Sequence, residues 1–531
     1  MKAPLVCRIK PYIQPFERTL AMAELHALAQ SEPIPVRSQS GDPVLFSLVP
    51  SINAENLARN LAYWEMVDSG ESLMTTQVLR ERTVNVVRNG VAPKEIPILL
   101  QAKEIGLPNR RCLRYGTHGI HEYRGKFFPQ LVRSLINIAR VPKRGLVADP
   151  MCGSGTTCVE SILGEYRTIG LDMNPLSVLM ARVKCSLLSV DADFLASAYE
   201  DLRARLLRPA ARRMARLTYL NSLPDRDQEY LLAWFSEQVL QDLDEVARAI
   251  LETDVRVRDF FWLCLSNILR AVSWQKDDDL RVRKEVRADT EIDPIREFLE
   301  EMGRSVRMVL AFLHQNAGSA IGGFEIKEGD ARGLASFWKQ RKGKIDAIIT
   351  SPPYATALPY LDTDRLSLCY LGLLSRPAHR KRDQEMIGNR EISDRQRVAY
   401  WNLFEDSHNG LPKSVSALIG KVSTLNAKIE VGFRRRNLPA LLTKYFLDMQ
   451  RVLEGVKEVL RPGCPAYVVV GNNHTIAGGQ RVEIETATLL VDIAKAVGLV
   501  AEQRVPMEML VSRDIFKSNA VASEEILFFR A

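Results

Sequence analysis

Residues 147–163 of the 531-residue chain read VADPMCGSGTTCVESIL, and this stretch decides the fold. An apolar run ends in Asp149 and is followed by Gly153, Ser154 and Gly155, after which a helix is expected to start at Thr156. Glycine lets a backbone turn sharply and approach a ligand closely because it has no Cβ. A strand, a terminal acid, a tight glycine turn and a helix start in this order predict a nucleotide-like cofactor at the carboxyl end of a sheet strand.

Apolar runs alternate with helical periods from about residue 111 onward, which predicts an α/β fold with a parallel sheet. The expected strands are 145–150, 167–172, 324–330, 346–351 and 466–472. Two further runs, 500–510 and 524–530, predict an antiparallel hairpin that closes one edge of this sheet. The predicted architecture is a Rossmann-like seven-stranded sheet with a large helical insertion and an N-terminal extension.

The same pattern divides the chain into six segments. They are an N-terminal extension without a clear role (1–110), the first part of the sheet domain with the glycine turn (111–185), a helical insertion (186–320), the core of the sheet domain (321–374), a basic insertion (375–436) and the remainder of the sheet domain (437–531). In the extension, helices are expected at 21–29 and 54–67. The basic insertion is polar and poorly periodic, which predicts loops.

Composition and charge exclude few classes of function. The net charge of +8 permits nucleic-acid binding without requiring it. Eight cysteines without a CxxC pair argue against a disulfide framework or a zinc site, and no metal is expected. The N-terminus has no continuous apolar stretch and the chain has no run of 18 apolar residues, so the sequence predicts a cytoplasmic protein.

Basic side chains cluster in three places that could contact phosphates. These are Arg203, Arg205, Arg208, Arg212, Arg213 and Arg216, then Arg376, Arg380, Lys381 and Arg382, and finally Arg434, Arg435 and Arg436. A solvated surface explains any one cluster equally well. The two insertions are therefore candidates for sequence recognition rather than established recognition elements.

Two more acids follow expected strands. Asp172 lies about twenty residues past the glycine turn, where a carboxylate can accept both hydroxyls of a ribose, and Asp330 is expected near the base of the cofactor. The glycine turn lacks the third glycine of a dinucleotide fingerprint and the lysine of a P-loop. S-adenosylmethionine is the cofactor that fits this pattern best.

The fourth expected strand ends in Ser351-Pro352-Pro353-Tyr354. Two consecutive prolines stiffen the loop and remove two amide donors, which leaves its carbonyls as acceptors. The Ser351 side chain and the Pro352 carbonyl could accept hydrogen bonds from an exocyclic amino group and orient its lone pair for in-line attack on a methyl group. Tyr354 offers a stacking surface for a base that has left its duplex.

These motifs resemble those of the DNA amino-methyltransferases, which modify cytosine N4 or adenine N6. DPMCGSGTT at 149–157, LDMNP at 171–175, EGD at 328–330, TSPPY at 350–354 and HEYRGKFFPQL at 121–131 are similar to that family's motifs I, II, III, IV and X. The resemblance covers about 115–185 and 324–531 and implies a methyltransferase sheet that binds S-adenosylmethionine. The cofactor-binding residues that follow from the motifs are Tyr123, Lys126, Phe127, Pro129, Asp149, Pro150, Met151, Gly153, Ser154, Gly155, Thr156, Asp172, Met173, Asp330 and Ala331.

The resemblance also implies a substrate and a setting. Serine at the first position of motif IV is more typical of N4-cytosine enzymes, so we expect methylation of cytosine N4 at a specific site in double-stranded DNA, with the target base flipped. Ser351, Pro352, Pro353 and Tyr354 are the expected catalytic residues. Adenine N6, an RNA base and a non-catalytic DNA-binding subunit remain alternatives. A restriction–modification or other defence system, with a possible partner from it, is the expected context.

Overall fold

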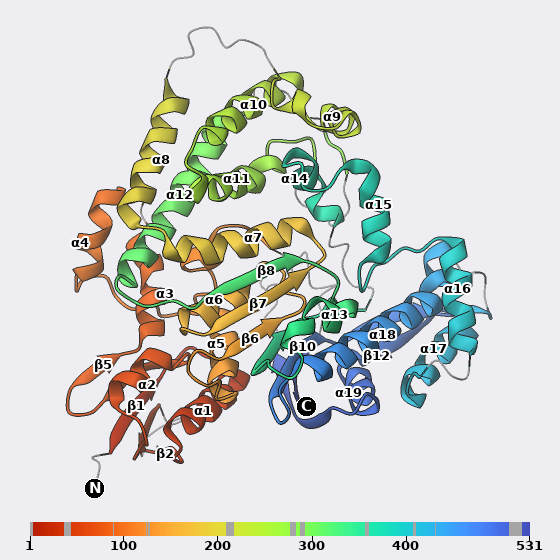
Figure 1. Cartoon of the computed structure of the whole chain (residues 1–531), viewed down its shortest axis with the longest axis horizontal. Coiled ribbons are helices and arrows are strands. Elements are labelled where there is room, and N and C mark those ends of the chain that lie inside the picture. The colour runs from red at the N-terminus through yellow and green to blue at the C-terminus, as the bar shows by residue number, and fades with distance from the viewer. Residues whose placement is uncertain are drawn as a thin grey trace.

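The computed structural model describes residues 4–36, 44–88, 90–123, 125, 128–208, 217–276, 283–286, 292–355, 361–406, 410–428, 430, 432–508 and 523–531. Figure 1 shows a central sheet with a helical lobe above it, an N-terminal region at its lower left and a second group of helices at its right.

The central sheet confirms the predicted fold class. Its seven strands are arranged in the order β13-β14-β10-β9-β6-β7-β8. They are β6 (Leu146–Asp149), β7 (Arg167–Asp172), β8 (Phe324–Glu328), β9 (Ala347–Thr350), β10 (Pro465–Gly471), β13 (Val500–Glu508) and β14 (Ser523–Arg530). Strands β8, β7, β6, β9 and β10 are parallel, whereas β14 pairs antiparallel with both β10 and β13. The predicted hairpin therefore closes one edge of the sheet.

Helices cover both faces of this sheet, which explains why its central strands are continuous apolar runs. Alternate strand residues pack into two different cores, one built with α1 (Pro15–Ala29) and α5 (Pro129–Ile138) and the other with α18 (Phe433–Val459) and α19 (Thr486–Ala496). Strands β6, β9 and β10 are buried along their whole lengths. The remaining helices of the sheet domain are α6 (Thr156–Leu163), α7 (Pro175–Ser186), α13 (Leu334–Phe337) and α14 (Arg365–Tyr370).

The predicted helical insertion forms the upper lobe in Figure 1. Its helices are α8 (Ala192–Leu207), α9 (Asp225–Leu232), α10 (Glu237–Leu251), α11 (Val255–Leu269) and α12 (Pro294–Gln315). Apolar side chains at spacings of three and four residues form one core with residues of α7, such as Leu176 and Met180. The lobe is thus packed onto the sheet domain through a shared hydrophobic core.

The segment 375–436 is mostly helical, so the expectation of loops is wrong. It contains α15 (Arg376–Glu385), α16 (Asp394–Glu405) and α17 (Lys413–Asn426). No residue of α16 and only His379 of α15 is buried, so neither helix has the buried apolar stripe that makes a helix recognisable in a sequence.

The N-terminal region contains a five-stranded antiparallel sheet that the sequence did not reveal. Its strand order is β2-β3-β1-β4-β5. The elements are β1 (Leu5–Ile9), β2 (Ile34–Pro35), β3 (Leu45–Leu48), α2 (Ala54–Asn60), β4 (Trp64–Asp68), β5 (Ser72–Met74), α3 (Thr76–Val86) and α4 (Ile96–Gln101). The helix expected at 54–67 ends at Asn60, because the following residues pair with β1 as strand β4.

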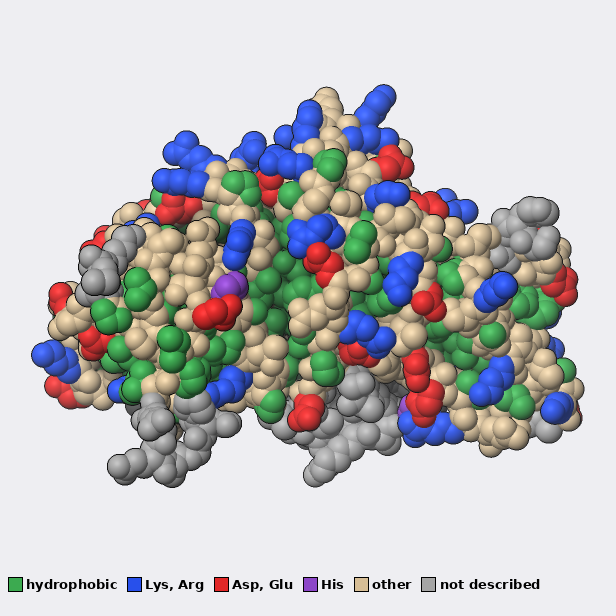
Figure 2. Space-filling view, turned by 90° about the horizontal axis from the view of Figure 1, so that it is seen from below, with side chains coloured by type: hydrophobic (Ala, Val, Ile, Leu, Met, Phe, Trp, Pro, Cys, Tyr) green, Lys and Arg blue, Asp and Glu red, His purple; other side chains and the backbone are tan. Residues whose placement is uncertain are grey.

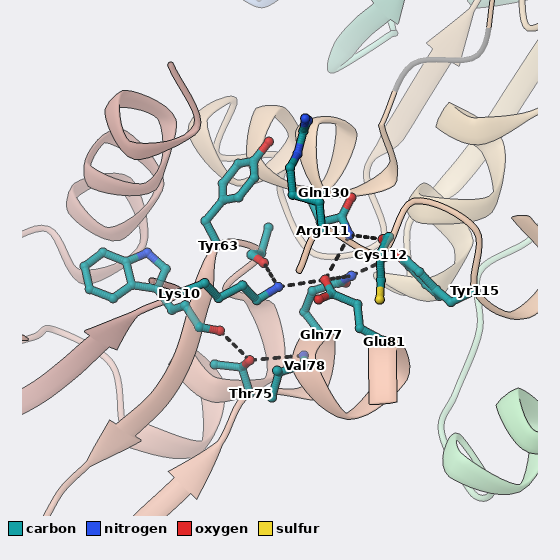
Figure 3. A network of polar contacts seen from close by, with 12 residues as sticks. Lys10, Tyr63, Thr75, Gln77, Val78, Glu81, Arg111, Cys112, Tyr115 and Gln130 are labelled. Atoms are coloured by element: carbon teal, nitrogen blue, oxygen red, sulfur yellow. Dashed lines mark hydrogen bonds and ion pairs between the residues drawn. The ribbon is translucent and has the colours of Figure 1, made fainter. Parts of the chain in front are cut away.

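A buried polar network joins this region to the sheet domain (Figure 3). The Lys10 ammonium donates to Glu81 Oε1 at 2.7 Å, and the side-chain amides of Gln77 and Gln130 each donate to the same oxygen at 2.9 Å. Gln77 also donates to the Tyr115 hydroxyl at 2.9 Å. Because a buried charge is tolerated only when it is paired and hydrogen-bonded, this network fixes the N-terminal region on the sheet domain. None of the described helices combines the length and hydrophobicity needed to cross a membrane.

Candidate functional site at the carboxyl edge of the sheet

The glycine turn after β6 has the geometry that its sequence predicts. Gly153 and Gly155 have φ angles of +48° and +84°, which L-residues with a side chain rarely adopt. A Cβ on Gly155 would lie 2.7 Å from the Cβ of Ala181 in α7, and one on Gly153 would lie 2.8 Å from Tyr123 Cε1. Glycine is therefore required at both positions, and Tyr123 lies directly over the turn.

Asp172, at the end of β7, holds this turn in place. One carboxylate oxygen accepts the N–H of Gly153 at 2.8 Å, and the other accepts the N–H of Asn174 at 2.8 Å. Burial raises the pKa of Asp172 to about 6. Each oxygen keeps a second lone pair, so the carboxylate can hold the turn and still accept a hydroxyl from a ligand. Met173 is partly buried beside it, and its carbonyl accepts a hydrogen bond from Arg382 at 2.6 Å.

Asp149, at the end of β6, is completely buried beneath the turn. Its Oδ1 accepts the N–H of Met151 at 3.1 Å. Burial raises the pKa of Asp149 to about 7, partly offset by the nearby hydroxyls of Thr157 and Thr350. Within the described residues, Oδ2 makes no hydrogen bond of good geometry.

The hydroxyl of Ser154 also lacks a hydrogen-bond partner among the described residues. Its side chain is 3% exposed. Leaving a buried polar atom unpaired costs about 1–3 kcal/mol, so both Ser154 Oγ and Asp149 Oδ2 are candidates for a hydrogen bond to a bound ligand. Pro150 and Thr156 are buried in the same turn, where they shape the backbone.

Asp330, which is expected near the base of the cofactor, already has partners within the chain. It caps the short helical turn Ala331–Gly333 and forms an ion pair with Arg332 at 2.6 Å. Arg332 also forms an ion pair with Asp448 of α18 at 3.1 Å. A ligand would therefore meet Asp330 as one half of an ion pair, while Ala331 is almost completely buried beside it.

The TSPPY loop leaves β9 at the same edge of the sheet as the glycine turn leaves β6. The two strands are parallel neighbours, with Ala148 opposite Ile348. The Thr157 hydroxyl at the start of α6 also donates to the carbonyl of Ile349 at 3.1 Å. The structure thus brings the two predicted loops together, with Ser351, Pro353 and Tyr354 partly exposed and Pro352 buried.

Three parts of the chain support the TSPPY loop, and the sequence singled out none of them for this role. The Asn473 side chain donates to the carbonyl of Ala355 at 2.9 Å, and the Tyr354 hydroxyl donates to the carboxylate of Glu524. At Gly388 (φ +74°), a Cβ would lie 2.9 Å from the carbonyl oxygen of Tyr354. Asn473 is the first residue of strand β11 (Asn473–Ala477), which pairs with β12 (Gln480–Ile484), and no short motif pointed to it.

The remaining predicted residues fall into two groups. Pro129 is buried in the first turn of α5. Lys126 and Phe127 lie outside the described residues. Of the motif upstream of the sheet, Tyr123 is thus the residue that the structure places at the glycine turn.

The three basic clusters are only partly free to bind phosphates. Arg203, Arg205, Arg382 and Arg434 form ion pairs with Glu200, Glu252, Glu328 and Glu391 respectively. Arg212, Arg213 and Arg216 lie outside the described residues. Figure 2 shows, on one face of the molecule, a hollow lined by hydrophobic side chains with Lys and Arg side chains around it. No group of His, Cys, Asp and Glu among the described residues has the arrangement of a metal site.

Comparison with known proteins points to one class of enzyme, although no protein-family model matches the chain. The Type II methyltransferase M.MvaI of Kocuria varians is 25% identical over 376 residues, which cover 67% of this chain and 77% of that protein. The Type II methyltransferase M.BsoBI of Geobacillus stearothermophilus is 21% identical over 429 residues, 73% of this chain and 81% of its own length. A stretch of 68 residues, 13% of each chain, is 41% identical to the Type II methyltransferase M.MjaII of Methanocaldococcus jannaschii.

A solved structure of the rRNA methyltransferase AviRa from Streptomyces viridochromogenes matches 77% of this chain at 10% identity. Its TM-score of 0.29 is too low to indicate a shared fold. The similarity to Type II methyltransferases extends over two thirds of the chain. The two motif loops meet at one edge of a seven-stranded sheet of the expected kind. The chain is therefore similar to Type II methyltransferases over two thirds of its length, and its motif loops lie where the resemblance to the DNA amino-methyltransferases implies.

Proposed function

We propose that this protein transfers a methyl group from S-adenosylmethionine to an exocyclic amino group of a base in DNA, and that the base is cytosine, modified at N4. The observation that carries the proposal is the meeting of the glycine turn and the TSPPY loop at the ends of adjacent parallel strands. A cofactor held by one loop and a base held by the other would then face each other across a short gap.

The residues at the glycine turn fit S-adenosylmethionine. Asp172 can accept ribose hydroxyls, and Oδ2 of Asp149 is an acceptor for a cationic N–H group. The buried carboxyl of Asp149 and the partly buried carboxyl of Asp172, both with raised pKa values, also suit a ligand that carries positive charge, since a nearby cation favours their ionised forms. When bound, the cofactor supplies an electrophilic methyl group on a sulfonium.

The TSPPY loop fits an exocyclic amino group. Ser351 and the carbonyl of Pro352 would accept its two hydrogen bonds, which orients the nitrogen lone pair toward the methyl group. Pro353 stiffens the loop, and the partly exposed ring of Tyr354 would stack on the flipped base and offset part of the cost of flipping, which is a few kcal/mol. The serine at position 351 supports cytosine N4 over adenine N6.

The similarity to Type II methyltransferases supports DNA as the substrate and a restriction–modification system as the setting. Lys and Arg side chains around the hollow in Figure 2 would favour a polyanion, since phosphate contacts supply most of the non-specific affinity for DNA. The helical lobe and the segment 375–436 both flank the sheet domain and are the candidate segments for sequence recognition.

The test is methyl transfer in vitro. Purified protein is incubated with tritiated S-adenosylmethionine and either unmethylated double-stranded DNA or RNA, and the labelled product is digested to nucleosides for mass spectrometry. We expect label in DNA as N4-methylcytosine. Label in N6-methyladenine would show that the base is adenine, and label in RNA would show that the substrate is RNA. Absence of transfer to both nucleic acids would contradict the proposed function.

A further inference from the structure

Glu524 is the second residue of β14 and lies at the carboxyl edge of the sheet. Strand β14 is antiparallel to β10, and Glu524 pairs in register with Gly471, the last residue of β10. The start of β14 therefore lies at the same edge as the TSPPY loop, separated from β9 by β10 alone. This register lets a side chain of β14 reach the loop across one strand.

The carboxylate of Glu524 accepts a hydrogen bond from the Tyr354 hydroxyl. Among the described residues, this hydroxyl is the one hydrogen-bond donor to Glu524, whereas the adjacent Glu525 pairs with Arg504 and Asn472. Burial raises the pKa of Glu524 above its ordinary value, and the hydrogen bond from Tyr354 opposes this rise. Among the described residues Glu524 has no basic partner, and a partly buried acid without one is costly, so its hydrogen bond to Tyr354 calls for an explanation.

The contacts of the TSPPY loop give that explanation. The backbone after Tyr354 is held by Asn473 through the carbonyl of Ala355, and the backbone of Tyr354 packs against Gly388. These contacts fix the main chain of the loop. Glu524 holds the hydroxyl end of the ring, so the hydrogen bond and the fixed main chain together set the direction in which the ring extends from the loop.

We propose that Glu524 is a positioning residue, which holds the ring of Tyr354 in the orientation needed to stack on the target base. This inference rests on the proposed function, because a stacked base is part of it. Glu524 acts only through Tyr354 and does not itself touch the reacting atoms. A preset ring reduces the conformational freedom that is lost when the base is bound.

The test combines Glu524→Ala, Glu524→Gln and Tyr354→Phe with the double variant Glu524→Ala/Tyr354→Phe. Glu502→Ala is the matched control, because Glu502 is a carboxylate of the same hairpin that pairs with Arg530 near the opposite edge of the sheet. We expect kcat for DNA methylation to fall about tenfold in Glu524→Ala, as for the loss of one hydrogen bond to a charged group, with an unchanged KM for the cofactor. Glu524→Gln keeps an acceptor for the hydroxyl and should recover most of the activity.

A purely structural role for Glu524 predicts a different pattern. If Glu524 acts through the Tyr354 hydroxyl, the double variant should be no slower than Tyr354→Phe alone. Additive losses, or an equal loss in Glu502→Ala, would overturn the proposal.

A measurement that needs no activity separates this proposal from the proposed function. Protein labelled with 3-fluorotyrosine gives a fluorine resonance for Tyr354 that is assigned by its absence in Tyr354→Phe. We expect this resonance to shift or broaden in Glu524→Ala and to stay near its wild-type position in Glu524→Gln and Glu502→Ala. An unchanged resonance in Glu524→Ala would overturn the positioning role even in an active enzyme, whereas wild-type protein that methylates neither DNA nor RNA would contradict the proposed function.

Discussion

Two fully buried carboxyls, Glu24 in α1 and Asp149 at the end of β6, differ in how completely the chain satisfies their hydrogen bonding. Both are 0% exposed, and burial raises the pKa of each to about 7. Glu24 accepts hydrogen bonds from the N–H groups of Ala62 and Tyr63 and from the side chain of Asn137, at 3.1, 3.0 and 2.9 Å. Asp149 leaves one oxygen without a good partner among the described residues.

The difference lies in whether the chain completes the hydrogen bonding itself. Glu24 joins the N-terminal region to α5 and has donors on both oxygens, so it needs no ligand. Asp149 lies under the glycine turn with the hydroxyls of Thr157 and Thr350 nearby, and its Oδ2 makes no hydrogen bond of good geometry among the described residues. Burial and a raised pKa alone therefore do not distinguish the two acids. We expect the incompletely hydrogen-bonded oxygen beside the turn to be the better indicator of a ligand-binding role.

The largest expected effect is on folding. Glu24→Ala leaves three buried donors unpaired and should lower the free energy of unfolding by at least about 3 kcal/mol, because each unpaired donor costs about 1–3 kcal/mol. Denaturant unfolding measures this loss. The surviving folded protein should bind S-adenosylhomocysteine with wild-type affinity, and a weakened affinity would show that the comparison between the two acids is wrong.

Asp149→Asn should give the opposite pattern. It removes a buried charge without a large change in shape, so the free energy of unfolding should stay within about 1 kcal/mol of wild type or rise. Affinity for the positively charged S-adenosylmethionine should fall about tenfold or more, as for the loss of a hydrogen bond to a charged group. Isothermal titration calorimetry measures the affinity, and unchanged binding would remove Asp149 from the site.

A smaller effect is expected from pH. In the free protein the pKa of Asp149 is raised to about 7 and that of Asp172 to about 6, so both acids gain charge as the pH rises through this range. Ionised carboxylates attract the cationic cofactor, and its affinity should rise up to about tenfold between about pH 5.5 and 7.5, since one pKa unit corresponds to a factor of ten. The rise should be smaller in Asp149→Asn, and a pH-independent affinity in wild type would contradict the role of both acids.

The stability of the ligand-free protein should change with pH in the other direction. A carboxyl whose folded-state pKa is raised stabilises the fold in its protonated form, so this contribution is complete below its unfolded pKa and is lost as the pH rises through about 7. Glu24 and Asp149 should contribute to this loss, and Asp172 should contribute as the pH rises through about 6. Saturating S-adenosylmethionine should offset the parts due to Asp149 and Asp172 but not the part due to Glu24, which thermal unfolding across pH 5–8 with and without the cofactor can measure.

The sequence predicted the central sheet because its strands are continuous apolar runs that end in acids or in the TSPPY loop. The N-terminal sheet escaped prediction because its strands are short and gain stability from pairing, as in β2, which has only two residues. The pairing of β4 with β1 also ended a helix that local propensity would have continued past Asn60. Segment 375–436 was misjudged because its helices α15 and α16 are exposed and lack a buried apolar stripe, although α17 buries Val415, Ile419 and Val422.

The parts of the candidate site that are short, continuous motifs could be predicted from the sequence, whereas contacts between distant residues could not. The glycine turn and TSPPY are each short motifs, and their meeting follows from the parallel order of strands β6 and β9. Glu524 was not predictable as the partner of Tyr354, because 170 residues separate the two in the sequence. The ion pair between Asp330 and Arg332 could have been predicted, since the two residues are only two positions apart in the sequence.

The most direct test of the central claim is methyl transfer by Ser351→Ala, measured as a single turnover with tritiated S-adenosylmethionine and double-stranded DNA. If the two loops form one active site, the variant should bind S-adenosylhomocysteine and DNA as wild type does, and its rate of methyl transfer should fall about a hundredfold or more, as for the loss of a preorganised hydrogen bond to a reacting group. A wild-type rate in Ser351→Ala would contradict the claim that the TSPPY loop holds the reacting base.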